Sequence, residues 1–187
     1  MLASASGTYT IHRYPAYLIE RWTVANGREV TIRPVLPQDD AIEQSFIRRL
    51  SPESRYSRFL VGMNELTPAM LSYFTAVDYR NHLALIAETF DDDDEVQIGD
   101  SRYVVEGDGD GANADFAIAV ADAWQQSGIG ARLLATLERG ARMAGVKRLT
   151  GDVLGSNRKA LDFMSRRGFT LRANREELRL MRVVKEL

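Results

Sequence analysis

The chain has 187 residues, a hydrophobic fraction of 45% and a formal net charge of −2, which predict one globular domain and give no sign of a nucleic-acid or membrane partner. The absence of cysteine excludes disulfides, thiolate metal ligands and a cysteine nucleophile. The start has no signal-peptide pattern and no run of about 20 apolar residues occurs, so we expect a cytoplasmic protein.

Residues 1–14 are small and polar and predict a flexible N-terminal segment, followed by one domain over 15–187. The segment 15–35 predicts an extended hairpin, because Asn26 and Gly27 form a turn signal between two strand-like runs. Apolar residues at helical spacing, with capping residues or proline at the starts, predict three helices next. These helices are expected over 39–50, 51–59 and 67–77.

The second half of the chain alternates between strand-like and helical patterns. Strands are expected over 82–90, 96–106, 115–121, 147–154, 169–173 and 178–184, and helices over 128–145 and 158–167. The acidic turn 91–95 and the Gly/Asp-rich loop 107–114 separate the first three of these strands. The order predicts an α/β (α+β) fold with a mixed, mostly antiparallel sheet flanked by helices.

Two glycines stand at the start of the longest predicted helix, in the run Gln125-Gln126-Ser127-Gly128-Ile129-Gly130. A helix N-terminus offers unpaired N–H groups and partial positive charge, and glycine lets an anion approach the backbone closely. The run therefore predicts a phosphate site. The alternative is that the first glycine ends a turn and the second permits close helix–sheet packing.

Two well-known phosphate motifs do not fit this run. Leu133 occupies the position of the third glycine of the dinucleotide-binding fingerprint, and the chain has no Gly-Lys-Ser/Thr sequence of a P-loop. Instead the run resembles the Q/R-x-x-G-x-G/A signature of the GNAT acetyltransferase superfamily, which cradles the pyrophosphate of coenzyme A. Residues 153–169 resemble the second motif of that superfamily, with Asn157 followed by Gly168-Phe169.

The N-terminal sequence is similar to a subgroup of this superfamily. Residues 14–40 and 50–59 are similar to the acetyltransferase domain of Pat-type protein lysine acetyltransferases. The resemblance extends from about Tyr14 to about Val184. It implies a single-domain GNAT fold and an acetyl-CoA-dependent N-acetyltransferase, in which a protein lysine amine attacks the thioester directly.

The resemblance also implies how the acetyl donor is held. The strands at 115–121 and 147–154 would splay apart to open a cleft, with pantetheine bound along the main chain of the first strand. The cofactor-binding residues implied are Ile118, Val120, Gln125, Gln126, Ser127, Gly128, Ile129, Gly130, Ala131 and Asn157. For Asn157 the alternative, or additional, role is that of a helix N-cap.

A lysine amine has an ordinary pKa near 10.4, so a base must accept its proton before or during attack. Asp115 occupies the position at which the Pat-type subgroup has a glutamate base, and it is one methylene shorter, which favours a water relay. The alternative for Asp115 is a solvated loop residue, and Glu88 and Glu106 are weaker candidates. Met164 stands where many GNAT proteins have a tyrosine acid, so any acid would come from water or another group.

Three interpretations of function remain open: a protein lysine as acceptor, a small amine as acceptor, or a non-catalytic acetyl-CoA-binding module. A homodimer is compatible with the sequence. We expect no metal, because 91–94 and Asp108-x-Asp110 lack the rest of a calcium-loop pattern. Residues 91–115 hold ten acidic and one basic side chain, which would steer a lysine-bearing acceptor or simply be solvated. Arg55, Tyr56, Arg58 and Phe59 would contact the acceptor or pack in the core.

Overall fold

The computed structural model describes residues 14–92, 94–106 and 112–187. Its strands are β1 (Glu20–Thr23), β2 (Glu29–Pro34), β3 (His82–Asp91), β4 (Asp94–Val105), β5 (Asn113–Val120), β6 (Arg148–Leu154), β7 (Thr170–Ala173) and β8 (Leu180–Glu186). Its α-helices are α1 (Asp40–Arg49), α2 (Pro52–Phe59), α3 (Pro68–Thr75), α4 (Ile129–Ala144) and α5 (Arg158–Arg166), and its 3-10 helices are η1 (Ala16–Leu18), η2 (Pro37–Asp39) and η3 (Asp122–Trp124).

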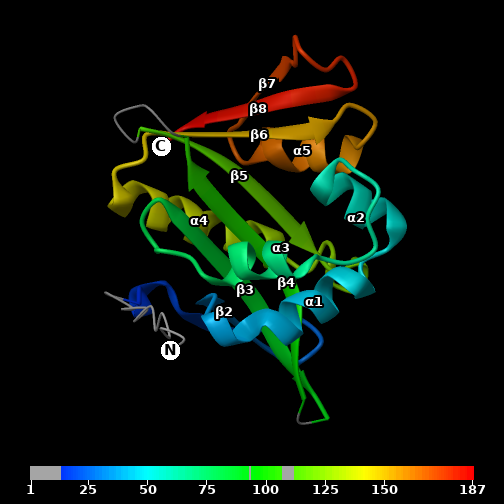
Figure 1. Cartoon of the computed structure of the whole chain (residues 1–187), viewed down its shortest axis with the longest axis vertical. Coiled ribbons are helices and arrows are strands. Elements are labelled where there is room, and N and C mark those ends of the chain that lie inside the picture. The colour runs from blue at the N-terminus through cyan, green and yellow to red at the C-terminus, as the bar shows by residue number, and fades with distance from the viewer. Residues whose placement is uncertain (1–13, 93, 107–111) are drawn as a thin grey trace, which may run out of the picture.

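All eight strands form one sheet in the order β1-β2-β3-β4-β5-β6-β8-β7 (Figure 1). Every neighbouring pair is antiparallel except β5 and β6, which are parallel. The predicted mixed, mostly antiparallel sheet flanked by helices is therefore confirmed. The predicted helices and strands are all present, with ends that differ by a few residues.

The acidic turn predicted over 91–95 is shorter in the structure. The pairing of β3 with β4 continues to Asp91 opposite Asp94, so most residues of the predicted loop belong to the two strands. Asp92 takes a positive φ of 47° at the tip, a conformation that aspartate tolerates better than most residues. Of the predicted flexible segment 1–14, residues 1–13 lie outside the described part of the chain, as do Asp93 and loop residues 107–111. Tyr14 is described, and its hydroxyl donates to the Pro34 carbonyl at 3.0 Å.

Local sequence signals account for the starts of the short helices. The Ser51 hydroxyl accepts a hydrogen bond from the Ser54 amide at 3.1 Å, and the Thr67 hydroxyl accepts one from the Met70 amide at 3.3 Å. In both helices proline follows the cap, where its missing N–H costs nothing. No helix in the described ranges is long and apolar enough to cross a membrane.

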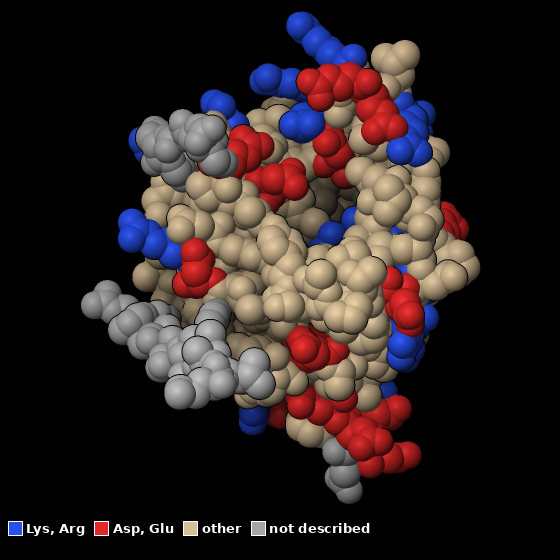
Figure 2. Space-filling model, in the orientation of Figure 1, with Lys and Arg blue, Asp and Glu red and all other residues tan. Residues whose placement is uncertain are grey.

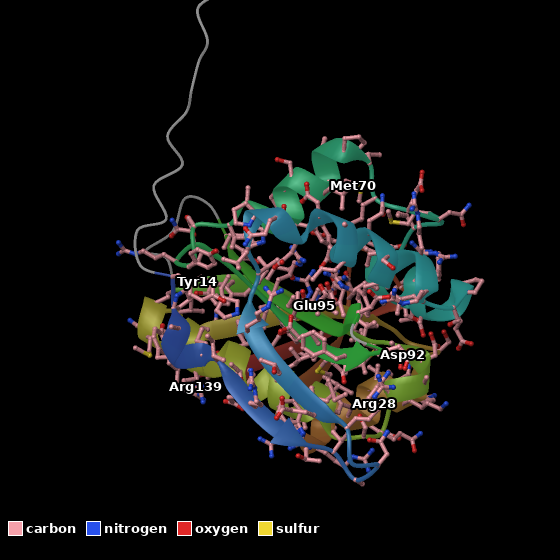
Figure 3. All side chains as sticks on the ribbon, turned by 90° about the horizontal axis from the view of Figure 1, so that it is seen from below. Tyr14, Arg28, Met70, Asp92, Glu95 and Arg139 are labelled. Carbon is pink, nitrogen blue, oxygen red and sulfur yellow. The ribbon has the colours of Figure 1, made fainter. Side chains whose placement is uncertain are left out.

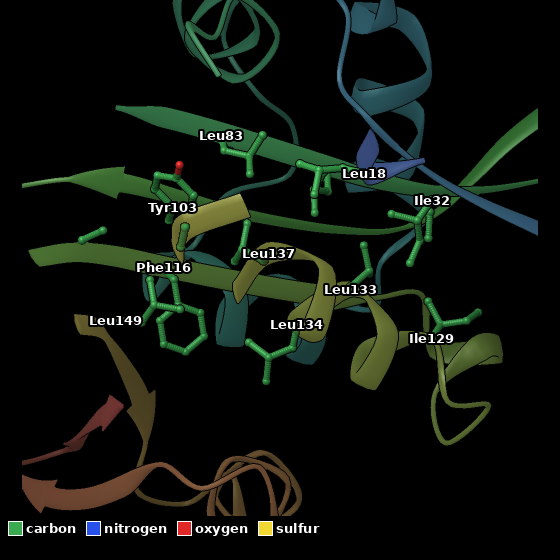
Figure 4. Packing of buried hydrophobic residues seen from close by; sticks show 14 of the residues in the cluster. Leu18, Ile32, Leu83, Tyr103, Phe116, Ile129, Leu133, Leu134, Leu137 and Leu149 are labelled. Atoms are coloured by element: carbon green, nitrogen blue, oxygen red, sulfur yellow. The ribbon is translucent and has the colours of Figure 1, made fainter. Parts of the chain in front are cut away.

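Helices cover the sheet on both faces, as the view from below shows (Figure 3). On one face α4 and η1 form the larger core, in which Leu18, Leu83, Leu133 and Leu137 are at most 1% exposed (Figure 4). On the other face α1, α2 and α3 pack around Phe46 and Phe74. Burying each large apolar side chain contributes about 1.5–3 kcal/mol, so both layers hold the sheet firmly.

Candidate active site

The strands β5 and β6 are paired along only part of their length. The register pairs are Asn113–Arg148, Ala114–Leu149 and Asp115–Thr150, and beyond them the strands diverge (Figure 1). Figure 2 shows a hollow between the region of β5 and that of β6 and α2, with acidic side chains along its rim and basic atoms visible inside. The predicted splayed strands and the cleft between them are therefore present.

The main chain of β5 turns a free edge toward this cleft. The Ala121 amide donates to the Ile98 carbonyl at 2.9 Å, on the β4 side. Because amides of successive strand residues point to opposite edges, the amides and carbonyls of Ile118 and Val120 face the cleft. The Gln125 Nε2 lies 3.3 Å from the Val120 carbonyl oxygen, which agrees with this direction. Both predicted pantetheine-binding residues therefore lie on the free edge.

The side chains of β5 divide between the two faces of the sheet. Phe116, Ile118 and Val120 pack against the α4 core, whereas Ala119 packs against the α1–α3 layer. Alternation then places Asp115 and Ala117 on the α1–α3 side, together with Ala119. A second substrate could thus reach the cleft from the side that carries Asp115 and two small residues.

The N-terminus of α4 lies at the end of β5 and the short turn that follows it. The first hydrogen bond of the helix runs from the Arg132 amide to the Gly128 carbonyl at 3.2 Å, so the amides of Ile129, Gly130 and Ala131 precede it. Among the described residues, no side chain caps this helix. Uncapped amides and the helix dipole make this terminus a suitable anion site.

The two glycines of the signature have different structural reasons. Gly128 has a φ of +88°, in the left-handed region that favours glycine. Gly130 has no such φ, and a Cβ there would lie 3.5 Å from Val120 Cγ2 and 3.7 Å from Phe163 Cζ, which are ordinary contacts. The close-packing explanation of Gly130 finds no support in these distances. Its missing side chain leaves room beside the free edge of β5.

The polar residues before Gly128 shape the turn itself. The amide of the Gln125 side chain lies 3.4 Å from the Ser54 hydroxyl as well as near Val120. Gln126 has a positive φ of 64°, and the Ser127 hydroxyl donates to the Trp124 carbonyl. These residues hold the turn that brings the start of α4 to the cleft.

Asn157 occupies the N-cap of α5. Its Oδ1 accepts from the Ala160 amide at 3.1 Å, so the N-cap alternative is confirmed. Its Nδ2 lies 3.4 Å from the Ser57 hydroxyl on α2, which connects the β6 side of the cleft to the helical layer. Met164 is 4% exposed within the core and offers no group to the cleft.

Asp115 lies at the narrow end of the cleft, where it is accessible to solvent on one side and faces protein on the others. The pKa of its carboxyl is raised to about 6, chiefly by loss of solvent and next by the negative charge of Asp152, while Arg182 and Arg58 act in the opposite direction. Asp152 is itself held by Arg182, with oxygen–nitrogen distances of 2.8 and 2.9 Å. A carboxylate with this pKa is ionised at neutral pH and still basic enough to accept a proton.

The two weaker candidates for a base have different surroundings. Glu88 is buried on β3, where its carboxylate accepts from Arg33 Nε at 2.7 Å, and β4 separates it from β5. Glu106 is exposed after β4, close enough for its charge to raise the pKa of Asp115. Of the three acidic candidates, Asp115 is the one that stands at the end of the β5–β6 pairing.

A buried charge pair, which sequence reasoning missed, lies beside the cleft. Arg58 Nη2 is 3.0 Å from Asp100 Oδ2 and Arg58 Nε is 3.3 Å from Asp100 Oδ1, with Asp100 wholly buried on β4. Arg102 adds a second cation 3.4 Å from Asp100 and stacks 3.7 Å over the Phe74 ring. The signal available was the alternation of Asp100 and Arg102 between the apolar residues Ile98 and Tyr103 of β4.

Two other residues of the α2 cluster, Arg55 and Phe59, serve packing. Arg55 donates to the Met63 carbonyl at 2.7 Å and the Leu50 carbonyl at 2.9 Å, and so ties α2 to the end of α1. The Phe59 ring packs 6.1 Å from the Phe74 ring. For Arg55 and Phe59 the structure favours the packing alternative.

A groove of about 320 Å³ runs between α4 and α5, beside Ala131. Arg166, Arg167 and Lys185 lie along it, and Lys185 Nζ is 2.6 Å from Glu138 Oε1. This basic groove shares Ala131 with the anion site at the start of α4. Within the described ranges no three His, Cys, Asp or Glu side chains are grouped so that they could hold a metal ion, and Asp108 and Asp110 lie outside them.

Comparison with known proteins gives several matches. The acetyltransferase (GNAT) family matches residues 50–169. An acetyltransferase of Pseudomonas aeruginosa is 33% identical over 147 residues, which cover 77% of this chain and 76% of that protein. Acetyltransferase Pat of Mycolicibacterium smegmatis is 32% identical over 149 residues, which cover 78% of this chain and 42% of Pat. The chain therefore spans less than half the length of that relative.

Among solved structures, the GNAT domain of S. lividans PAT superposes with a TM-score of 0.84 at 26% sequence identity. The superposition covers 94% of this chain and 100% of that domain. The likeness thus includes β1, β2 and the α1–α3 layer as well as the β5–α4 segment.

Proposed function

The chain belongs to the acetyltransferase (GNAT) family and uses acetyl-CoA, and from this premise we propose that it acetylates the side-chain amine of a protein lysine. The observation that carries the proposal is one cleft that joins three features. These are the free edge of β5, the uncapped N-terminus of α4 and the carboxylate of Asp115.

We propose that the donor lies along the cleft from the start of α4 toward Asp115. The amides of Ile129, Gly130 and Ala131 would bind the pyrophosphate, with Gly128 providing the turn. The main chain of Ile118 and Val120 would pair with pantetheine. The basic groove between α4 and α5 would accommodate the charged nucleotide end.

In the chemical step, the proton of the lysine ammonium passes to Asp115, directly or through a water molecule. The neutral amine then attacks the thioester carbonyl, and a backbone N–H of β5 stabilises the tetrahedral oxyanion. The C–S bond breaks as the amide forms. The tetrahedral intermediate still carries a second proton on its amine nitrogen, and this proton passes to solvent as the amide forms. The coenzyme A thiolate leaves and takes a proton from solvent, since Met164 has none to give.

The choice of a protein lysine over a small amine rests on the likeness to Pat. Acetyltransferase Pat of M. smegmatis matches 78% of this chain, and the GNAT domain of S. lividans PAT superposes on 94% of it. The charges of Asp152 and Glu106 act on Asp115, and these carboxylates would attract a cationic amine of either kind.

The test is incubation of the purified protein with host lysate and isotopically labelled acetyl-CoA, followed by mass spectrometry. The matched control is the Asp115→Asn protein, which keeps the side-chain size. We expect labelled lysines that depend on Asp115. Label found only in small amines would replace the protein acceptor with a small one. Tight binding of coenzyme A with no labelled acceptor would support a non-catalytic module instead.

A further inference from the structure

Phe116 is the first residue of β5 beyond its last register pair with β6, and its ring closes the narrow end of the cleft on the α4 side. The ring is 6% exposed, and its centroid lies 5.1 Å from that of Phe169, with the ring planes inclined by 35°. Figure 4 shows Phe116 beside Leu149, which belongs to the paired part of β6. The end of the hydrogen-bonded pairing is thus filled by an aromatic ring.

Gly151 follows Thr150 on β6, where the Phe116 ring lies against its main chain. A Cβ at Gly151 would be 3.0 Å from Phe116 Cε1, 3.3 Å from Phe116 Cδ1 and 3.0 Å from the Phe116 carbonyl oxygen. The ring therefore reaches from β5 to the backbone of β6. It forms a hydrophobic wedge where the hydrogen bonds between the two strands stop.

We propose that this wedge limits the acyl group that the enzyme accepts, with Phe116 as the residue that determines chain length. The inference rests on the proposed function. The thioester has to lie near Asp115, because the amine proton passes to that carboxylate. With pantetheine along Ile118 and Val120, the acyl group then points into the narrow end of the cleft, toward Phe116 and Gly151.

An acetyl group ends in a single methyl and stops short of the wedge. Each further methylene has to enter the volume that the Phe116 ring fills. The ring cannot move aside easily, since Phe169 and Gly151 both contact it and close-packed interiors resist added atoms. One methylene changes enzyme specificity by about 10- to 200-fold, so acetyl-CoA should be preferred over butyryl-CoA by at least that range.

The experiment compares wild-type protein with Phe116→Ala and the milder Phe116→Leu. Calorimetry gives the dissociation constants of coenzyme A, acetyl-CoA and butyryl-CoA, and steady-state assays give kcat/KM with each acyl donor. The matched control is Leu85→Ala, which removes a fully buried side chain from β3, a strand that β4 separates from β5. Circular dichroism verifies that each variant is folded.

For Phe116→Ala we expect unchanged affinity for coenzyme A and a rise of at least about tenfold in the butyryl-to-acetyl ratio of both affinity and kcat/KM. Phe116→Leu should give a smaller rise and decides the question if the alanine variant does not fold. An unchanged ratio in the folded Phe116 variants, or an equal rise in Leu85→Ala, would overturn the inference. Failure of wild-type protein to bind coenzyme A would contradict the proposed function instead.

Discussion

Asp115 lies directly opposite Thr150 in the last register pair between β5 and β6. The hydroxyl of Thr150 is buried and has no hydrogen-bond partner among the described residues. Asp115 therefore lies where the pairing of β5 with β6 ends, next to a Thr150 hydroxyl that makes no hydrogen bond to the described residues.

The first prediction concerns the pH dependence of acetyl transfer. The pKa of Asp115 is raised to about 6, and a base acts only when deprotonated, so kcat/KM should fall as pH drops through about 6. Asp115→Asn should lower kcat/KM at pH 8 by about 10²-fold and remove this acidic limb. Asp115→Glu, which restores the length common in the Pat-type subgroup, should remain active. An unchanged pH profile in the asparagine variant would exclude Asp115 as the base.

The second prediction concerns Thr150 and the water relay. If a water molecule carries the proton to Asp115, the neighbouring Thr150 hydroxyl is placed to bind it. Thr150→Val keeps the shape of the side chain but removes the hydroxyl. It should lower kcat about tenfold, which corresponds to the loss of one hydrogen bond of about 1.4 kcal/mol. Thr150→Ser should restore the rate. Equal rates in the valine and wild-type proteins would show that the proton reaches Asp115 without this hydroxyl.

The third prediction separates the two glycines of the signature. Gly128→Ala should destabilise the fold by about 1–2 kcal/mol, because alanine is strained at a φ of +88°. Gly130→Ala should leave stability equal or raised by up to about 1 kcal/mol, since its Cβ makes only ordinary contacts in a helix. Urea unfolding measures both effects.

The affinity of these two variants for coenzyme A should not follow their free energies of unfolding. Gly130→Ala should weaken coenzyme A binding by about tenfold although the fold is intact, because the new methyl group stands beside the amides that would hold the pyrophosphate. Calorimetry provides the measurement. Undiminished affinity in Gly130→Ala would show that the open space at this position has no part in donor binding.

The fourth prediction uses a cluster away from the cleft. Arg33 bonds to Glu88 at 2.7 Å, Asp39 at 2.6 Å and Glu95 at 2.8 Å. Burial, followed by the hydrogen bond to Glu95, raises the pKa of Glu88 to about 8. The folded protein holds the proton of Glu88 more tightly than the unfolded chain does, so the protonated carboxyl contributes to stability. This contribution is lost as pH rises from about 4.5 to about 8.

Wild-type protein should therefore lose unfolding free energy between pH 6 and pH 8, by up to about 1.4 kcal/mol for each pH unit. Glu88→Gln has no charge to gain and should lose less over the same range. The control is Glu65→Gln, since Glu65 is half exposed in its ion pair with Arg48. Parallel stability curves for wild type and Glu88→Gln would contradict the prediction.

The sequence carried enough local information to predict most of the fold. Asn26-Gly27 marks the first hairpin, Ser51-Pro52 and Thr67-Pro68 mark helix starts, and Gly128 marks the start of α4. Each of these signals acts within a few residues, because turns and caps depend on the local backbone. The free edge of β5 followed from the resemblance to the GNAT superfamily.

Features that depend on contacts between distant segments could not be predicted. The Arg58–Asp100 pair requires α2 to lie over β4, and the position of Thr150 beside Asp115 requires the register of two strands that are far apart in sequence. A change of register by one residue would reverse the faces of all these side chains. The same holds for Asp152 and Arg182, whose charges influence Asp115 only after β6 and β8 have paired.

The unpaired edge of β5 also bears on solubility. Exposed strand edges are templates on which other chains add as extra strands and aggregate. Here the edge lies in a recess, and contacts from Asn157 to Ser57 and from Arg179 to Tyr56 link its two sides. A further β-strand could pair with this edge only by displacing these two contacts, which limits aggregation through β5.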